Sequence, residues 1–302
     1  TAFGMQLRQA EVSGRRILLP DAEPSVPAAL AEVIDGLVSL SDLHSRPLHR
    51  STPLPDSAVS RKAASPAEAP SPQATFGNSH YLAANDFHTI YNLKTVLQQG
   101  VTGAGRSIAI VGRSNIVIED VNQFRSNMAL PANPPQVVVA GTLPGFVSGD
   151  ELEANLDVEW AGAVAPGATV KYVVAASTTT SDGVALAAQH AVNNDIGDVI
   201  SVSYGLCEAA MGRTATNFYS SLWQQAAAQG QTVVVSSGDS GAAGCDLASS
   251  STATGGQGVN GLCTSPYSTC VGGTQFNDTA NPSAWWSANN DAGLGSALSH
   301  IP

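Results

Sequence analysis

Two carboxylates four residues apart, Glu153 and Asp157, are the first side chains whose types and spacing suggest chemistry. They lie between residues 148 and 166, where apolar side chains recur at helical spacing. Residues four apart stack on one face of a helix, and like charges there repel. Two carboxyl groups at the edge of a core push their pKa values apart, which lets one act as a base. On spacing alone, a solvated acidic helix face is the simpler interpretation.

The helix that carries this pair is predicted to bury an apolar stripe on a neighbouring face. The predicted stripe consists of Leu152, Leu156, Trp160 and Ala163. Ser148 or Asp150 can cap the start of the helix, and Pro166 closes it. The two carboxylates would then lie about 100° around the helix from the stripe, beside the core.

Asp239 is a third candidate, because it follows a predicted buried strand at 232–236. That strand runs into a glycine-rich turn at 237–241. In parallel sheets the chemistry lies beyond the carboxyl ends of the strands, which is where this turn places Asp239. The alternative is an aspartate that only shapes the turn by accepting from backbone N–H groups.

The histidines are weaker candidates than the carboxylates. None of the six lies in an H-G-T or H-E-x-x-H setting, and His190 falls in an alanine-rich helical stretch where packing is expected. No Cys/His cluster has the spacing of a zinc site, so no metal is predicted. A histidine-based triad is therefore poorly supported.

The cysteines allow three pairings. They are Cys207, Cys245, Cys263 and Cys270. The last two bracket a short turn and could close a small disulfide loop, which would leave the first two to pair. Such bridges would indicate an oxidising, extracytoplasmic compartment. Four buried free thiols are the alternative.

The elements that must position these residues alternate between strands and helices. Near-continuous Val/Ile runs predict strands at 107–112, 168–175, 199–204 and 232–236, and helical stretches are expected near 182–193 and 214–229. This pattern predicts an α/β fold with a mostly parallel sheet covered by helices on both faces.

The chain divides into three parts by composition. Residues 1–45 form a first unit with a short helix after Pro27, whose buried face would be Ala29, Leu30, Val33 and Leu37. Residues 46–79 are rich in Pro, Ser and Ala and predict a linker with a processing site. Residues 80–302 form the main domain.

Overall composition excludes several classes of function. The net charge of −11 makes nucleic acid an unexpected partner, and no apolar run is long enough to cross a membrane. With only 12% charged residues and few basic ones, the chain suits an acidic medium, although it also fits an ordinary acidic soluble protein. The chain begins without Met and ends at Pro302, so we expect a fragment.

Several segments, taken in order, resemble the sedolisin, or serine-carboxyl peptidase, family. They are 103–111 (GAGRSIAIV), 153–157 (EANLD), 165–168 (APGA), 201–205 (SVSYG), 237–241 (SGDSG) and 265–274 (SPYSTCVGGT). The resemblance implies a subtilisin-like fold and a secreted endopeptidase that works in acid. Residues 1–45 would be the C-terminal tail of an activation pro-domain. The pro-domain and a polypeptide substrate would be the partners, with no membrane partner.

The resemblance also implies roles for individual residues. Glu153 would be the general base, Asp157 would orient it, and Asp239 would stand in the oxyanion hole. The substrate would bind along Ser203, Tyr204, Gly205, Ser237 and Gly238. A carboxyl group donates a hydrogen bond to an oxyanion only when it is protonated, which agrees with activity in acid.

One departure from the family pattern concerns the nucleophile. The family's serine lies in a G-T-S-x-x-x-P motif that does not occur here, since Thr274 is followed by Gln275. The family's calcium ligands follow that serine and are also expected outside the chain. We therefore expect the 302 residues alone to be inactive.

Other interpretations stay open or are disfavoured. A secreted peptide-binding domain without catalysis is the main alternative. A classical subtilisin is disfavoured because the strand at 107–112 leads into Arg113 rather than an aspartate. The G-D-S-G match to chymotrypsin-like peptidases covers only residues 238–241 and lacks that family's third glycine and its histidine segment.

Overall fold

The computed structural model describes residues 2–12, 15–49, 75–76, 79–246, 250–274, 277–278, 280–287 and 289–299. Most of the predicted linker, and any processing site between 50 and 74, lies outside the described residues.

A six-stranded sheet forms the centre of the described chain, and all its neighbouring strands run parallel. The strands are β6 (Ser107–Gly112), β7 (Gln136–Val139), β8 (Thr169–Val174), β9 (Val199–Val202), β11 (Thr232–Ser236) and β12 (Thr269–Val271). Their spatial order is β12-β11-β9-β6-β8-β7. The chain runs from β6 to the edge strand β7, returns to β8 beside β6, and then crosses to β9 on the other side of β6. In open α/β sheets such a change of direction lies where ligands bind, at the carboxyl ends of the central strands. The predicted α/β fold is confirmed.

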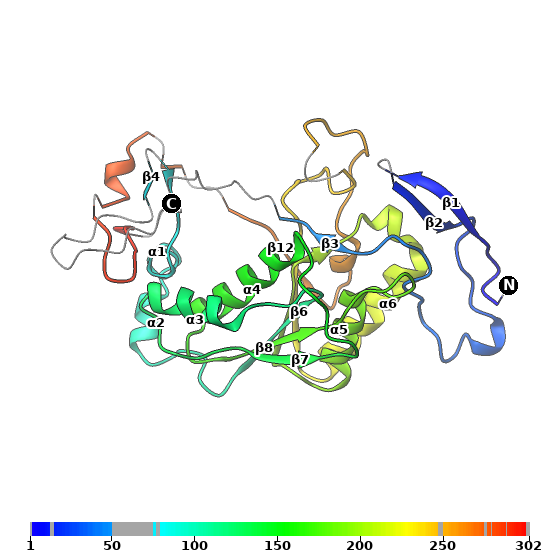
Figure 1. The fold of residues 1–302 in the computed structure, drawn as a ribbon, viewed down its shortest axis with the longest axis horizontal. Helices are drawn as coiled ribbons and strands as arrows, with labels where there is room; N and C mark the ends of the chain where they lie inside the picture. Colours follow the sequence, from blue (N-terminus) through cyan, green and yellow to red (C-terminus); the bar gives the residue numbers. More distant parts are fainter. Residues whose placement is uncertain are drawn as a thin grey trace.

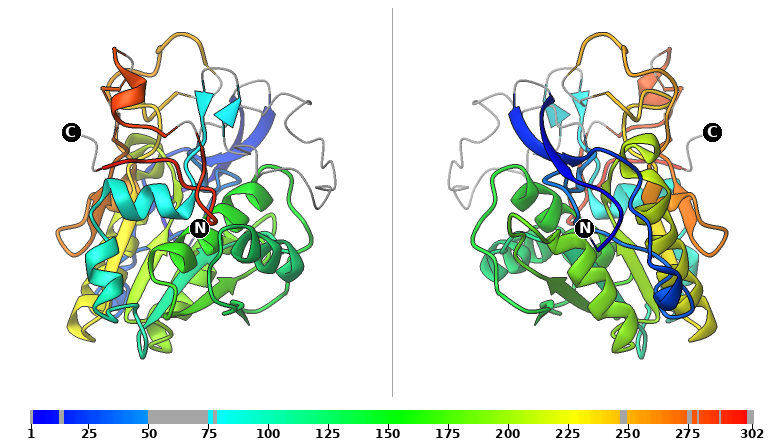
Figure 2. Two further views of the ribbon diagram at one scale, coloured as in Figure 1. Left: turned by 90° about the vertical axis from the view of Figure 1, so that its left-hand side faces the viewer. Right: turned by 90° about the vertical axis from the view of Figure 1, so that its right-hand side faces the viewer.

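Helices cover both faces of this sheet, as the end-on views in Figure 2 show. One face packs against α3 (Ile118–Asn127) and α4 (Asp150–Val164), and the other against α5 (Gly183–Asn193) and α6 (Glu208–Ala228). Apolar side chains point from β6 and β8 into both layers, which explains why those strands are nearly continuous runs of Val, Ile and Ala. No helix among the described residues is long and apolar enough to span a membrane.

The remaining elements are short. They are β1 (Leu7–Val12), β2 (Arg15–Pro20), β3 (Arg46–Pro47), β4 (Thr75–Phe76), β5 (Ser79–His80), α1 (Ala84–Ile90), α2 (Lys94–Gln98) and β10 (Tyr204–Gly205), with 3-10 turns at Ala28–Leu30, Gly261–Cys263 and Pro282–Ala284. Along the long axis of the molecule, the N-terminal hairpin lies at one end and the C-terminal segment at the other (Figure 1).

Three sequence expectations about these elements need correction. The strand predicted at 199–204 is divided into β9 and β10, because Ser203 leaves the sheet. The helix predicted from 214 begins at Glu208, with a kink at Gly212, where φ is 74°. The helix predicted after Pro27 is a single 3-10 turn, and Val33 of its expected buried face is 78% exposed.

The first unit lies against the helices of the main domain. Glu23 accepts hydrogen bonds from the backbone N–H and the hydroxyl of Thr214, just after the kink in α6. The unit then leads into β3, which pairs antiparallel with β10, so that Arg46 lies opposite Gly205 and Pro47 opposite Tyr204. Residues 45–49 therefore cross the carboxyl ends of the central strands.

Candidate functional site

The face that α4 buries is not the predicted leucine stripe. Leu152 is 50% exposed and Leu156 is 40% exposed, whereas Glu153 is only 4% exposed. The buried face consists of Asp150, Glu153, Ala154, Val158, Gly162 and Ala163. Of the predicted stripe, only Ala163 is fully buried. The expectation of a solvated acidic face is also wrong.

Small residues explain this orientation of α4. Ala154, Val158 and Gly162 allow the helix to approach the sheet closely, and a Cβ on Gly162 would lie 2.5 Å from the guanidinium of Arg125. The same helical face continues toward the N-terminus through Glu153 and Asp150, which are thereby carried under the protein surface. The start of α4 has no side-chain cap: Gly149 occupies that position with φ 88°, so neither Ser148 nor Asp150 caps it.

Glu153 and Asp157 form an acid pair whose pKa values are raised. Burial raises the pKa of Glu153 to about 7, opposed by hydrogen bonds from neighbours and reinforced by the charge of Asp239. Burial also raises the pKa of Asp157, and the charge of Glu153 adds to it. The hydroxyl of Ser203, in the residue between β9 and β10, donates to Asp157 Oδ1 at 2.8 Å. A pair of this kind retains a proton and titrates as a unit.

Asp239 lies three residues beyond the end of β11, on the same edge of the sheet as the acid pair. Asp239 is exposed, and its backbone N–H donates to the carbonyl oxygen of Leu48 at 3.2 Å. The preceding Ser237 donates its backbone N–H to Val271, and Gly238 turns the chain with φ 89°. The turn therefore presents a backbone donor, and beside it a carboxyl group, to the segment that crosses the site.

Three of the predicted substrate-binding residues, Tyr204, Gly205 and Gly238, lie beside residues 45–49. Gly205 faces Leu48 so closely that a Cβ there would lie 2.2 Å from Leu48 Cδ1. A Cβ on Gly238 would lie 3.0 Å from the same atom. The leucine side chain is thus held between two glycine backbones, and the pairing of β10 with β3 fixes its main chain.

His49 also belongs to this site, although no sequence pattern singles it out. Its Nδ1 contacts Glu153 Oε2, and the two residues are 104 positions apart in the chain. The peptide unit that joins Leu48 and His49 consequently lies between the Asp239 turn and the acid pair. No motif surrounds His49, so only the path of residues 45–49 reveals it.

Asn260 is a second residue that sequence reasoning missed. Its side chain is 2% exposed and donates to the carbonyl oxygens of Tyr204, at 3.0 Å, and Ser236, at 2.8 Å. One amide therefore ties the end of β11 to β10, the strand that pairs with residues 46–47. Its burial is a tertiary effect, with no signature in the local sequence.

Known proteins resemble this chain in sequence. No profile of a known protein family matches the chain. It is 28% identical over 256 residues to sedolisin from Pseudomonas sp. (strain 101), covering 81% of this chain and 40% of that protein. It is 29% identical over 251 residues to kumamolisin from Bacillus sp. (strain MN-32), covering 80% of this chain and 42% of that protein. Xanthomonalisin from Xanthomonas sp. (strain T-22) is 26% identical over 258 residues, with coverages of 79% and 29%.

A solved structure agrees with these relatives. It is Pseudomonas sedolisin, a serine-carboxyl proteinase, complexed with two molecules of pseudo-iodotyrostatin. It superposes with a TM-score of 0.57 at 26% identity, over 66% of this chain and 55% of that one. The chain is similar to members of the sedolisin family in sequence and in fold. It spans less than half the length of each of the three curated relatives.

Two disulfides brace the loops around the site. Cys207 is joined to Cys245 and Cys263 to Cys270, which confirms the predicted pairing. The first bridge connects the start of α6 to the turn that carries Asp239. The second joins the 3-10 turn after Asn260 to β12. Both therefore restrain the loops around the carboxyl ends of β11 and β12.

Proposed function

We propose that this chain forms part of a secreted serine-carboxyl endopeptidase that works in acid and is made as a zymogen. One observation carries the proposal. The peptide unit between Leu48 and His49 is held with its carbonyl oxygen at the Asp239 N–H and its histidine ring at Glu153. An extended peptide held by strand pairing beside an acid pair is in the position that a peptidase substrate must take.

Glu153 is proposed as the general base, with Asp157 as the residue that orients it. The serine hydroxyl would give its proton to the pair and attack the peptide carbonyl. The pair can accept this proton while at least one of its carboxyl groups is ionised. The raised pKa values favour the form with one proton and one charge over the fully ionised form, and a base is most efficient near its own pKa.

Asp239 is proposed to stabilise the oxyanion that forms on the attacked carbonyl. A carboxylic acid donates a hydrogen bond to an oxyanion only when it carries its proton. The Leu48 carbonyl already contacts the backbone of Asp239, so a substrate carbonyl in that place would be within reach of the turn. This role would set an upper pH limit on activity, while protonation of both members of the acid pair would set a lower one.

Residues 1–45 are proposed to act as the end of the pro-domain, with the first residues of the linker directly after it. The Glu23 contacts with Thr214 dock this unit on α6, and residues 45–49 then occupy the groove. A substrate-like segment in the groove would block other peptides until it is cut or released. The processing site is proposed within 46–79, and the two disulfides favour secretion into an oxidising compartment.

The nucleophilic serine and the calcium ligands are proposed to lie outside the 302 residues, which would be inactive alone. The test therefore uses the full-length natural protein and a synthetic peptide with the sequence of residues 44–50, HSRPLHR. We expect hydrolysis in acid, and Glu153→Gln should lower kcat/KM by about a thousandfold, the scale of general base catalysis. Glu151→Gln is the matched control, because Glu151 is a carboxylate on the same helix that does not contact Asp157, Ser203 or His49.

Two results would contradict the proposal. Near-normal turnover by Glu153→Gln would refute its role as base. Tight binding of the peptide by wild-type protein without any cleavage would identify a peptide-binding domain instead.

A further inference from the structure

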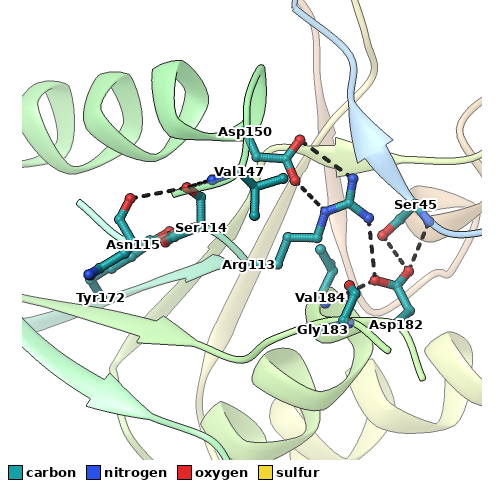
Figure 3. Close-up of polar contacts among 11 residues, drawn as sticks. Ser45, Arg113, Ser114, Asn115, Val147, Asp150, Tyr172, Asp182, Gly183 and Val184 are labelled. Carbon is teal, nitrogen blue, oxygen red and sulfur yellow. Dashed lines mark hydrogen bonds and ion pairs between the residues drawn. The ribbon is translucent and has the colours of Figure 1, made fainter. Parts of the chain in front are cut away.

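A buried arginine joins two aspartates at the same edge of the sheet (Figure 3). Arg113 is the first residue after β6, and its side chain is 14% exposed. Its guanidinium contacts Asp150 through Nε and Nη2, and its Nη1 lies 3.8 Å from Asp182 Oδ1. Burial opposes the charge of Arg113, but the two carboxylates outweigh it and raise the pKa of the guanidinium.

The backbone around Arg113 is fixed by its neighbours. The Tyr172 hydroxyl donates to the Ser114 carbonyl oxygen at 2.7 Å, and the Ser114 hydroxyl oxygen accepts from the Val147 N–H at 2.9 Å. Gly112 allows this arrangement, because a Cβ there would lie 2.1 Å from the tyrosine oxygen. The guanidinium is thus placed by β6, β8 and the loop before α4.

The two carboxylate oxygens of Asp182 accept hydrogen bonds from different residues, Val184 and Ser45, as Figure 3 shows. Its Oδ1 accepts from the Val184 N–H at 3.0 Å and caps α5. Its Oδ2 accepts twice from Ser45: from the backbone N–H at 2.8 Å and from the hydroxyl at 2.5 Å. Ser45 is 3% exposed, and Asp182 is 6% exposed. Capping α5 needs only Oδ1, so the contact with Ser45 is a separate use of this carboxylate.

Ser45 occupies a defined place relative to the peptide unit at the acid pair. It immediately precedes β3 and lies three residues before Leu48. A buried serine hydroxyl on a carboxylate gains a charge-assisted hydrogen bond, whereas alanine leaves the same oxygen short of a partner. A larger side chain must find room in a position that is already almost closed to solvent.

We propose that Asp182 forms a subsite that selects serine three residues before the residue that occupies the Leu48 position. This inference rests on the proposed peptidase function and names a specificity for it. Arg113 is the residue that positions this subsite, because it holds Asp182 beside the start of the helix that carries Glu153.

The test measures kcat/KM of the full-length protein on HSRPLHR and on the same peptide with Ala, Thr or Val in place of Ser. We expect the serine peptide to be preferred over the alanine peptide by about 10- to 100-fold, the scale of a hydrogen bond to a charged group. Equal values for the two peptides would overturn the proposal.

Asp182→Asn isolates the oxygen that meets Ser45. Asparagine caps helices as well as aspartate does. Its amide nitrogen, however, cannot accept from the Ser45 N–H when it replaces Oδ2. The serine preference should then fall to less than about threefold. Asp195→Asn, the same substitution just beyond the other end of α5, should keep the preference. A preference that survives Asp182→Asn would also overturn the proposal.

Hydrogen exchange separates this subsite from the peptidase function. In full-length protein carrying Glu153→Gln, the Ser45 amide should exchange faster once Asp182→Asn is added, and unchanged exchange would overturn the subsite. Another outcome is faster exchange while active wild-type protein shows no preference for the serine peptide. The contact with Asp182 would then only anchor the chain's own residues 45–49, which contradicts the proposal. Absence of any hydrolysis by wild type refutes the peptidase function, whereas unchanged exchange of the Ser45 amide refutes the subsite.

Discussion

Two pairs of acids lie at the same edge of the central sheet, and their surroundings differ in one respect. Asp150 and Asp182 share the fixed cation of Arg113. Glu153 and Asp157 have a serine hydroxyl and the ring of His49, but no guanidinium or ammonium in contact among the described residues. Burial raises the pKa of both members of the second pair. The comparison indicates that a buried acid pair without a cation in contact holds a proton more tightly than a free carboxyl group does.

Removing the cation should produce the largest effect on stability. Arg113→Met leaves two buried carboxylates without a counterion, and we expect a loss of about 3–5 kcal/mol in the free energy of unfolding. Urea denaturation at neutral pH measures it. Arg106→Met is the matched control, because its ion pair with Asp198 is exposed and should contribute less than about 1 kcal/mol. Equal losses for the two variants would remove the distinction between the pairs.

The second pair should make the fold more stable in acid. The pKa of Glu153 rises from 4.5 to about 7 on folding, so the folded state holds a proton that the unfolded chain has released. Its contribution is therefore complete below pH 4.5 and is lost as the pH rises to about 7. We expect a decline on the order of 2 kcal/mol across this range.

Two variants sharpen this pH dependence. Glu153→Gln should reduce the decline, measured by denaturation at several pH values. Burial also raises the pKa of Glu159 to about 7, and this residue offers a comparison outside the contacts of residues 45–49. Glu159→Gln should reduce the decline in stability without changing peptide hydrolysis. A wild-type stability that rises from pH 4.5 to 7 would contradict the raised pKa values.

The smallest expected effect concerns Asp239, an exposed acid that belongs to neither pair. Asp239→Asn can donate without a bound proton. In the full-length protein it should keep part of its activity, reduced by about tenfold to a hundredfold, and lose the upper pH limit. The measurement is the pH profile of kcat/KM. An unchanged profile would count against an oxyanion role.

The sequence predicted strands and a disulfide pairing that the structure has, and it singled out three carboxylates whose roles stay a prediction. Val/Ile runs identified the strands, because strands buried on both faces must be apolar along their length. The carboxylates Glu153, Asp157 and Asp239 were selected from their spacing, their place after a strand and the family resemblance. The disulfide pairing followed from the short loop between Cys263 and Cys270.

The orientation of α4 shows the limit of periodicity. Helical spacing tells which residues share a face, but it does not tell which face meets the sheet. The leucines suggested one face, whereas close packing through Ala154 and Gly162 turned another inward together with Glu153. The continuous stripe of small residues at helical spacing was the available signal.

The sequence by itself therefore determined the α/β architecture and the types of group at the site, because both depend on local patterns of residues. Only the tertiary structure placed Ser45 on Asp182, 137 positions away, and His49 on Glu153, 104 positions away. It also decided that one acid pair receives Arg113 and the other does not. Such contacts depend on the order of the strands around β6 and on how residues 45–49 cross the carboxyl ends of the central strands, and no local pattern contains that information.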